Sequence, residues 1–448
     1  MSTAAVERTS RVAPWIGLGV ALVLVALAIA VPRLLDWEVY TYSVPDPSNV
    51  PPLHAKWDPK VGAGTIPVLL LAFLGWRHGT ALAQRLGWAQ LLIVSYVAAA
   101  AWLFALAYVD GTAGISRMLG NPYEYLETAR MITDVPAMLA EFVDRIPYAA
   151  EPDNWVTHIA GHPPGALLFF VLLDRIGLGG DYAAAAVVVL LAATLPAAVL
   201  VTLRTLGVEP VARRAAPFLV LGPAAVWTAV SADAVFAVTA AWGLAALARA
   251  ATRRRTLSMV GWSTAAGVVL GSCVLLSYGL LLLGFLALAV LAAGRCWRPL
   301  PIAVLAATVP VLAMAAAGFA WWEAFPVLRE RYWDGLAADR PASYWWWGNL
   351  AALCLCAGPL LGAALGRLVA LGRRTERTVL LLVTAAVATI VVADASGMSK
   401  AEVERIWLPF VPWLLVATAV LPEQWRRHGL GLQILSAVIL QHLFYTGW

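Results

Sequence analysis

Long apolar runs recur along the whole 448-residue chain, and they limit its fold more than any other feature. Runs of this kind cross the hydrocarbon core of a bilayer as helices, because a helix satisfies its own backbone hydrogen bonds where water is absent. Charged residues make up only 13% of the chain, whereas a soluble domain carries roughly 25%. The sequence therefore predicts an all-α polytopic membrane protein.

The first apolar run, residues 13–31, lies where a signal peptide would lie. It is longer than the apolar core of a signal peptide, and the sequence PRLLDWEVY behind it is not a small-residue cleavage site. We interpret it as a retained first span. The four cysteines lie in or beside apolar segments, so a disulfide framework in the outer loops is not expected.

Arginine clusters between the apolar runs predict the topology, because cytoplasmic loops of membrane proteins are enriched in Arg and Lys. If all the clusters are cytoplasmic, about thirteen spans follow, with the N-terminus inside and the C-terminus outside. The expected spans are residues 13–31, 63–76, 88–109, 181–203, 214–231, 234–250, 257–274, 277–294, 299–320, 345–366, 378–394, 405–421 and 429–447. The short run 166–177 contains Asp174 and Arg175, so we expect it to be a helix in the outer interface.

The expected spans form three parts, each with its own outer loops. These parts are residues 1–87 with loop 32–62, residues 88–250 with the long loop 110–180, and residues 251–448 with loops 321–344 and 394–404. Many of the 21 tryptophans lie near the edges of these loops, as expected for an interfacial belt. Aromatic platforms also suit sugar rings, which favours a carbohydrate substrate.

Two residues of the long outer loop are candidates for chemistry. Asp110 directly follows the apolar run 91–109, and a carboxylate at a helix end before a long outer loop suggests chemistry at the membrane surface. Its alternative role is to cap the interfacial helix that follows. His162 precedes two prolines in the segment 161–165, and its alternative role is a hydrogen bond to the loop backbone.

Two further candidates lie at predicted helix ends. Asp233 is flanked by Ala and Val at the outer end of a span, where an ionisable group is costly unless it serves a cavity or a partner. The pair Glu404-Arg405 opens the apolar run that follows it. Such a pair can mark a helix boundary, but an arginine there is also suited to hold a phosphate.

The order of these features resembles the GT-C superfamily of membrane glycosyltransferases, and most closely the protein O-mannosyltransferase and lipid A aminoarabinose transferase type. In that type the first outer loop carries Asp-Glu and, later, Lys or His before Pro-Pro-Leu. The matching residues here are Asp110-Gly111, His162-Pro163-Pro164-Gly165, Asp233 for the second aspartate, and Arg405-Ile406-Trp407-Leu408-Pro409 for the Arg-Tyr-x-x-Pro stretch. The resemblance covers residues 88–250 well and residues 378–421 loosely.

The resemblance implies an inverting transfer of a sugar from a polyprenyl-phosphate donor to a glycan, lipoglycan or protein acceptor. The expected location is the cytoplasmic membrane, with the active site on its outer face. Asp110 is the expected general base, and cationic or polar side chains are expected to stabilise the leaving phosphate. The expected substrate-binding residues are His162, Asp233, Arg405, Glu404, Lys400, Arg331 and Tyr123. Mannose and arabinofuranose both remain open as the sugar.

Two departures from the resemblance leave alternatives open. Gly111 replaces the usual second acidic residue, and two predicted spans precede the one that carries Asp110. Asp36 and Glu38, just behind the first span, are therefore rival bases. A lipid or solute transporter (a flippase, for example) and a non-catalytic scaffold of the same fold are the rival functions.

Other partner classes are not indicated by the sequence. The six histidines do not pair at metal-ligand spacing, so we expect no metal and no cofactor beyond the lipid-linked sugar substrate. The formal net charge of +5 is what basic cytoplasmic loops produce, so it does not point to nucleic acid. Membrane lipids are the remaining expected partners.

Overall fold

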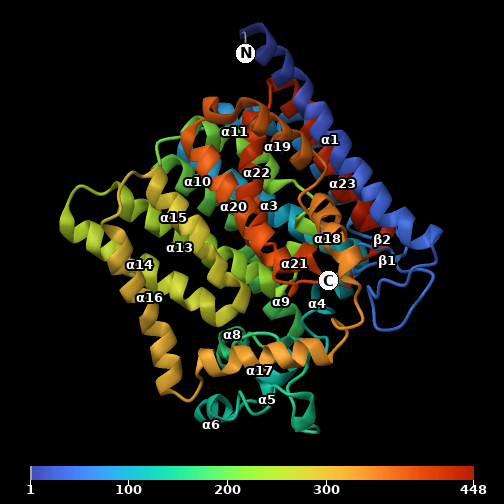
Figure 1. Ribbon diagram of the computed structural model, residues 1–448, viewed down its shortest axis with the longest axis vertical. Coiled ribbons are helices and arrows are strands. Elements are labelled where there is room, and N and C mark those ends of the chain that lie inside the picture. Colours follow the sequence, from blue (N-terminus) through green and yellow to red (C-terminus); the bar gives the residue numbers. More distant parts are fainter. Residues whose placement is uncertain (1–2, 448) are drawn as a thin grey trace.

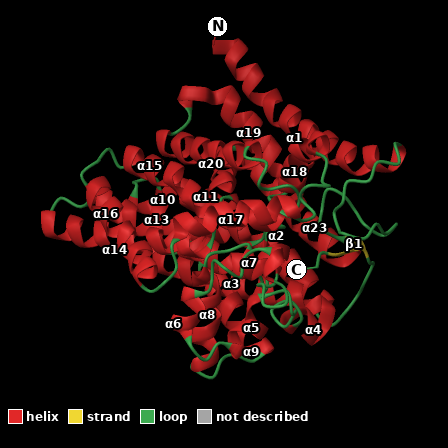
Figure 2. Cartoon of the chain, turned by 60° about the horizontal axis from the view of Figure 1, so that its bottom comes forward, coloured by secondary structure: helices red, strands yellow, loops and turns green. Residues whose placement is uncertain are grey.

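The computed structural model describes residues 3–447 and is built almost entirely of helices (Figures 1 and 2). Within these residues the one sheet is an antiparallel pair of two-residue strands, β1 (Lys56–Trp57) and β2 (Phe444–Tyr445). The all-α class expected from the sequence is confirmed.

The helices before the long loop and those within it differ in length. The first three are α1 (Thr3–Leu34), α2 (Thr65–Arg85) and α3 (Trp88–Ala107). The loop that follows contains η1 (Tyr108–Asp110), α4 (Gly111–Ser116), α5 (Tyr125–Met131), α6 (Val135–Ala140), η2 (Tyr148–Ala150), α7 (Thr157–Ala160) and α8 (Pro164–Arg175). A helix is present at the expected place as α8, which has 12 residues and is too short to cross a bilayer, and its location in the outer interface stays a prediction.

Longer helices resume after the loop. They are α9 (Asp181–Ala192), α10 (Leu195–Thr205), α11 (Glu209–Val220), α12 (Ala225–Thr228), α13 (Ala232–Thr252), α14 (Thr256–Leu276), η3 (Tyr278–Leu282), α15 (Leu283–Ala293), α16 (Pro299–Ala316) and α17 (Trp321–Asp334). The last group is α18 (Ala342–Cys356), α19 (Leu360–Leu371), η4 (Gly372–Arg374), α20 (Arg377–Ala395), α21 (Val403–Ile406), α22 (Val411–Leu415), η5 (Val416–Val420) and α23 (Glu423–Leu443).

Eight helices of the described chain are long and apolar enough to cross a membrane, or nine if the bent pair α18–α19 is one span. The eight are Arg11–Leu34, Thr65–Arg85, Trp88–Ser116, Asp181–Thr205, Ala232–Thr252, Thr256–Leu276, Pro299–Ala316 and Arg377–Ala395. The chain is thus a membrane protein by the length and composition of its helices, with fewer such helices than the roughly thirteen expected from the positive-inside rule.

Proline, glycine and polar residues account for the difference. Gly222-Pro223 separates α11 from α12, and Pro409 and Pro412 interrupt the expected span 405–421. The expected span 277–294 begins with a 3-10 turn, which leaves only 11 α-helical residues in α15. In α23 the polar side chains of Gln433 and Gln441 lie along the expected span 429–447. An apolar run in the sequence therefore does not always become one long helix.

The expected span 345–366 is broken in the middle. Helices α18 and α19 meet at 103°, and Gly358 has φ +83°, a value that favours glycine. Gln433 closes the gap: its Nε2 donates to Ala357 O at 2.7 Å, and its Oε1 accepts from Leu360 N at 3.2 Å. The break therefore exposes neither of these backbone groups to the apolar interior.

The predicted outer loops 110–180 and 321–344 fold against each other at one end of the molecule, below the bundle in Figure 1. There α17 lies beside α5 and α8, while the N-terminus, α11 and α19 lie at the opposite end. Arg331 of α17 donates to the backbone oxygens of Ile146 and Trp155, which joins the loops directly. The β1–β2 pair also places the C-terminal segment beside the 32–62 loop.

Helix α13 forms the centre of the bundle. It is buried along most of its length and packs against α9, α10, α14 and α15. Ten of its 21 residues are alanine, which allows close approach of neighbouring helices. Helix α13 starts at the side of the bundle where the outer loops gather. The side chain of Asp233 in its first turn therefore faces those loops.

Candidate functional site

A cavity of about 640 Å³ lies between the first turn of α13 and the folded outer loops. Its walls come from η2, α7 and the two residues 161–162 that follow it, η3, α17, the 335–340 turn, the end of α20 and the segment 396–410. These segments are separated by up to hundreds of residues in the chain, so only the tertiary fold assembles this site.

An unusual backbone turn carries the most polar wall of the cavity. Ala401 and Glu402 both have positive φ, 66° and 60°, a backbone conformation that residues other than glycine seldom adopt. Asn349 Oδ1 accepts from Ala401 N at 3.2 Å, and Arg340 Nη1 donates to Lys400 O at 2.6 Å, so the turn is held from two sides. Strained turns of this kind cluster at functional sites.

Arg405 is the centre of the ion pairs in this wall. Its Nη1 donates to Asp233 Oδ2 at 2.9 Å, and its Nη2 donates to Glu402 Oε2 at 3.2 Å. Asp233 in turn is held at the start of α13 by Ser231, whose hydroxyl also accepts from the Asp233 backbone N–H. Both side chains of the Arg405–Asp233 pair are only 6% exposed, so each charge needs the other.

Two further cations line the same wall. Arg340 donates to Glu402 Oε1 at 3.1 Å and to the backbone oxygens of Tyr40 and Lys400. Lys400 Nζ donates to Ala337 O at 3.0 Å and to Arg340 O at 2.9 Å, and it lies 4.7 Å from the Trp333 ring centre. Burial lowers the pKa of Lys400, and so does the charge of Arg340.

The cavity has a positive surplus. Four cationic side chains line it (Arg331, Arg340, Lys400 and Arg405), against the two carboxylates of Asp233 and Glu402. Two of the positive charges are therefore not balanced by lining carboxylates. In a partly enclosed site this surplus favours an anionic ligand.

The opposite wall is aromatic. Trp321 and Phe325 of α17 are stacked with ring centres 5.4 Å apart, and Tyr278 of η3 lies within 5.6 Å of both. Arg331 lies over the Tyr148 ring at 4.1 Å. Flat rings of this kind contact the apolar faces of sugars or the branches of an isoprenoid chain equally well.

Two histidines lie on the side of the cavity formed by the long loop. His162 Nδ1 donates to His158 O at 2.8 Å, and the His158 ring lies 2.6 Å from a carboxylate oxygen of Glu124. Burial lowers the pKa of His162, although the charge of Asp233 acts in the opposite direction. Burial alone would raise the pKa of Glu124, but His158 and Arg405 lower it overall.

Five of the residues singled out from the sequence meet in this cavity. His162, Asp233, Arg331, Lys400 and Arg405 all line it, although they span more than half of the chain. They come from four different segments, and no local spacing pattern connects them. The fold thus brings five of the predicted site residues together in one cavity.

Glu404 and Tyr123 are not among the lining residues. Glu404 is fully buried on the other side of α21, where its Oε1 accepts from His54 N at 2.9 Å. Burial raises the pKa of Glu404 to about 7. The Tyr123 side chain is 61% exposed, and only its backbone oxygen approaches the site, as acceptor from His158 N at 3.4 Å.

The three predicted bases also lie outside the lining residues. Asp110 is held by Lys60, with Nζ 3.1 Å from Oδ1, and by Gln441 Nε2, which donates to Oδ2 at 2.9 Å. It does not cap a helix with its side chain either. Asp36 and Glu38 are exposed in the 32–62 loop, where Glu38 Oε1 accepts from Tyr40 N.

Sequence reasoning missed four residues that contribute to the site: Glu124, His158, Arg340 and Glu402. His158 precedes His162 by four residues, the spacing of one helical turn, and this was the available signal. Glu402 precedes Arg405 by three residues, so the spacing of an ion pair on one helical face was also an available signal. Arg340 carries no such signal, because its partner Glu402 is far away in the chain. Across residues 3–447, no cluster of His, Cys, Asp or Glu is suited to hold a metal ion.

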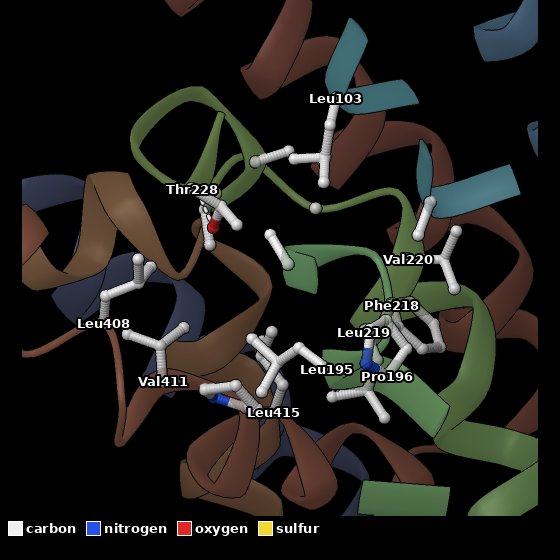
Figure 3. A pocket seen from close by; sticks show the side chains of 16 residues that line it. Leu103, Leu195, Pro196, Phe218, Leu219, Val220, Thr228, Leu408, Val411 and Leu415 are labelled. Carbon is white, nitrogen blue, oxygen red and sulfur yellow. Dashed lines mark hydrogen bonds between the residues drawn. The ribbon is translucent and has the colours of Figure 1, made fainter. Parts of the chain in front are cut away.

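A smaller crevice of about 40 Å³ lies beside the cavity (Figure 3). Its lining is apolar apart from Thr228, whose hydroxyl donates to Ala224 O. Leu408 and Val411 line the crevice, while Pro409 and Phe410 between them line the larger cavity. Without a titratable side chain the crevice offers no chemistry, so the larger cavity is the candidate site.

Comparisons of the chain with protein-family profiles, with curated proteins and with solved structures find no match.

Proposed function

We propose that this chain is an integral-membrane glycosyltransferase of GT-C type, with about thirteen membrane-crossing or re-entrant segments. It moves a sugar from a polyprenyl-phosphate donor to a cell-envelope glycan, lipoglycan or protein on the outer face of the cytoplasmic membrane. One observation carries the proposal: five predicted substrate residues line one cavity that has two surplus positive charges and an aromatic wall.

The charges of the cavity fit a lipid-linked phosphosugar. In the reaction the acceptor oxygen bonds to the anomeric carbon, the bond from that carbon to the phosphate oxygen breaks, and its electron pair stays on the phosphate. The acceptor proton passes to a base. Arg405 and Lys400 stabilise the charge that develops on the phosphate, because charge-assisted hydrogen bonds are stronger in an enclosed site. Asp233 orients Arg405 through their ion pair.

The donor's isoprenoid chain needs an apolar exit. Leu281 of η3 and Val392 of α20 both line the cavity, and they are 59% and 42% exposed. Exposed apolar side chains are expected where a helix faces lipid. The donor chain therefore leaves the cavity between η3 and α20, while the sugar and phosphate stay inside.

A transporter is the second candidate, because the α18–α19 break resembles the discontinuous helices of transporters. Such helices offer free backbone groups to a substrate near the middle of the membrane. Here Gln433 occupies the groups on either side of the break. The ionisable residues of the cavity lie instead at the end where the outer loops gather, which favours the transferase.

The proposal predicts that the purified full chain releases polyprenyl phosphate from short-chain polyprenyl-phosphate sugars when an envelope acceptor fraction is present. Mannose and arabinofuranose donors are compared, and the lipid product is measured by mass spectrometry. Arg405→Gln should lower turnover about 100-fold, since it removes a donor to the leaving phosphate. The matched control Arg254→Gln changes an exposed arginine outside the cavity and should leave turnover unchanged.

Two results would contradict the transferase. One is the absence of release with every donor from protein whose cooperative thermal unfolding shows that it is folded. The other is donor-dependent flux in proteoliposomes without any release, which would favour the transporter.

A further inference from the structure

Most of the Asp, Glu, Lys and Arg side chains that line the cavity belong to one neutral network. Asp233 accepts from Arg405, and Glu402 accepts from both Arg405 and Arg340. Two carboxylates in this network therefore balance two guanidinium groups. The positive surplus of the cavity is carried by the two cationic side chains that lie outside the network.

These two side chains are Lys400 and Arg331, and both are buried, at 9% and 6% exposed. Lys400 Nζ donates to the backbone oxygens of Ala337 and Arg340, and Arg331 donates to two backbone oxygens of the long loop. Within residues 3–447 neither side chain lies within ion-pair distance of a carboxylate. A buried charge without an opposite charge is costly, so both side chains are suited to an anionic ligand.

Side chains from three other segments hold the backbone around Lys400. Asn349 of α18 brackets it, because Nδ2 donates to the backbone oxygen of the preceding residue at 2.7 Å and Oδ1 accepts from the N–H of the following residue at 3.2 Å. The Tyr332 hydroxyl of α17 accepts from Lys400 N at 3.1 Å, and Arg340 Nη1 donates to Lys400 O at 2.6 Å. The ammonium group is therefore positioned before a ligand enters.

The Lys400 ammonium has one N–H left for a ligand. It carries three donors, and in the part of the chain that the structure describes only the backbone oxygens of Ala337 and Arg340 accept from it. Burial and the charge of Arg340 both lower the pKa of Lys400. A negative charge in the cavity would therefore stabilise the protonated amine and accept its third hydrogen bond.

The proposed transfer changes the charge of the lipid phosphate. In the donor this phosphate joins the sugar to the isoprenoid and carries one negative charge. When the bond from the anomeric carbon to the phosphate oxygen breaks, the electron pair stays on that oxygen, and the phosphate carries two charges above its second pKa of about 6. Two cations without carboxylate partners match the product better than the donor.

We infer that Lys400 and Arg331 form a site for a phosphomonoester dianion, the polyprenyl phosphate product, which the cavity binds more tightly than the donor; this inference rests on the proposed function. Lys400 contacts the phosphate, and Arg331 adds its charge from the same cavity. Val392, at the proposed exit of the isoprenoid chain, lies in the last turn of α20, and the segment behind it leads to Lys400. The same preference favours the transition state, in which the second charge develops, and its consequence is inhibition by the product.

The test compares two ligands that differ by one charge. The full-length protein in detergent is titrated at pH 8 with farnesyl phosphate, a dianion, and with its methyl ester, a monoanion, and calorimetry gives each Kd. Farnesyl phosphate should bind at least about 10-fold more tightly, because the second charge adds a charge-assisted hydrogen bond. Equal Kd values for the two ligands would overturn the inference.

A variant of Lys400 assigns the preference to this side chain. Lys400→Met removes the ammonium group but keeps an unbranched chain, so most of the difference between the two ligands should be lost. Lys56→Met makes the same change at a lysine outside the cavity and should keep both wild-type Kd values. A full preference in Lys400→Met would contradict the assignment. The comparison in the wild type needs no variant, so it decides the inference even if Lys400→Met does not fold.

Inorganic phosphate distinguishes a lipid headgroup from the free anion. It should not displace farnesyl phosphate at an equal concentration, because it lacks the isoprenoid chain. Displacement under that condition would assign the site to free phosphate and overturn the lipid product.

Turnover separates this inference from the proposed function. Farnesyl phosphate added to the release assay should inhibit with a Ki below the donor KM. Release that farnesyl phosphate does not inhibit overturns this inference alone. No release with any donor from folded wild-type protein overturns the proposed function, and the product role with it.

Discussion

Glu404 and Arg405 are neighbours in the chain but have opposite environments. Arg405 faces the cavity and makes ion pairs with Asp233 and Glu402. Glu404 points away from it and is fully buried, with its carboxylate accepting from His54 N. At the residue scale, adjacent charges in a sequence therefore do not share a role, because successive side chains of a helical turn point about 100° apart.

The raised pKa of Glu404 predicts a pH-dependent stability. Burial raises the pKa of Glu404 in the folded state to about 7, above its ordinary value of 4.5, so the native state binds the proton more tightly. This contribution is fully present below pH 4.5 and is lost as pH rises through 7, by about 3 kcal/mol in total. Glu404→Gln, a neutral isostere, should be more stable relative to wild type at pH 7.5 than at pH 5.

The measurement is the difference in unfolding midpoint between wild type and Glu404→Gln in detergent across this pH range. The other titratable groups are common to both proteins, so their contributions cancel in the difference. A difference that does not change with pH would show that Glu404 keeps an ordinary pKa in the folded state.

At the element scale, the break between α18 and α19 depends on one side chain from α23. Gln433 supplies a donor to Ala357 O and an acceptor to Leu360 N, while a Cβ at Gly358 would lie 2.0 Å from Gln433 Oε1. The bent pair and its glycine are therefore matched to Gln433. An apolar run thus becomes two helices at a right angle only because a distant helix satisfies its backbone.

We predict that Gln433→Leu destabilises the protein by about 2–5 kcal/mol, since two buried backbone groups lose their partners. Gln424→Leu lies on the same helix at an exposed position and should have almost no effect. Thermal unfolding in detergent and the yield of monodisperse protein measure the difference. Equal stability of the two variants would show that the break does not depend on Gln433.

On the scale of the whole molecule, the loops and termini are divided between two ends. The long loop and α17 share one end with the cavity, and β2 joins the C-terminal segment to β1 of the 32–62 loop (Figure 1). Arg254 lies in the short connection between α13 and α14, in a cluster of three arginines. The positive-inside rule predicts that this connection is cytoplasmic and that the end with the cavity faces outward.

The topology predicts opposite labelling of two single-cysteine variants in a background without the four native cysteines. Asp58→Cys, at an exposed position behind β1, should react with a membrane-impermeant maleimide in intact cells. Arg254→Cys should react only after the cells are permeabilised. Labelling in the reverse order would show that the protein has the inverse orientation. Labelling of both variants from one side would show that these two loops do not lie on opposite sides of the membrane.

The sequence by itself determined the membrane class, the short helix near 166–177 and most of the long helices. The hydrocarbon core of a bilayer requires helices that are apolar and long enough to cross it, so local patterns in the sequence are sufficient to predict them. It also identified His162, Asp233, Arg331, Lys400 and Arg405, because ionisable residues beside apolar runs are costly and therefore noticeable.

Only the tertiary structure decided which of these residues meet. It joined His158 to Glu124 and Arg405 to Asp233, and it kept Asp110 with Lys60 and Gln441 outside the cavity. It also divided apolar runs at prolines and at Gly358, where satisfaction of backbone hydrogen bonds depends on remote side chains. Ion pairs, and side chains that hydrogen-bond the backbone at a helix break, join positions far apart in the chain. No local pattern in the sequence contains that information.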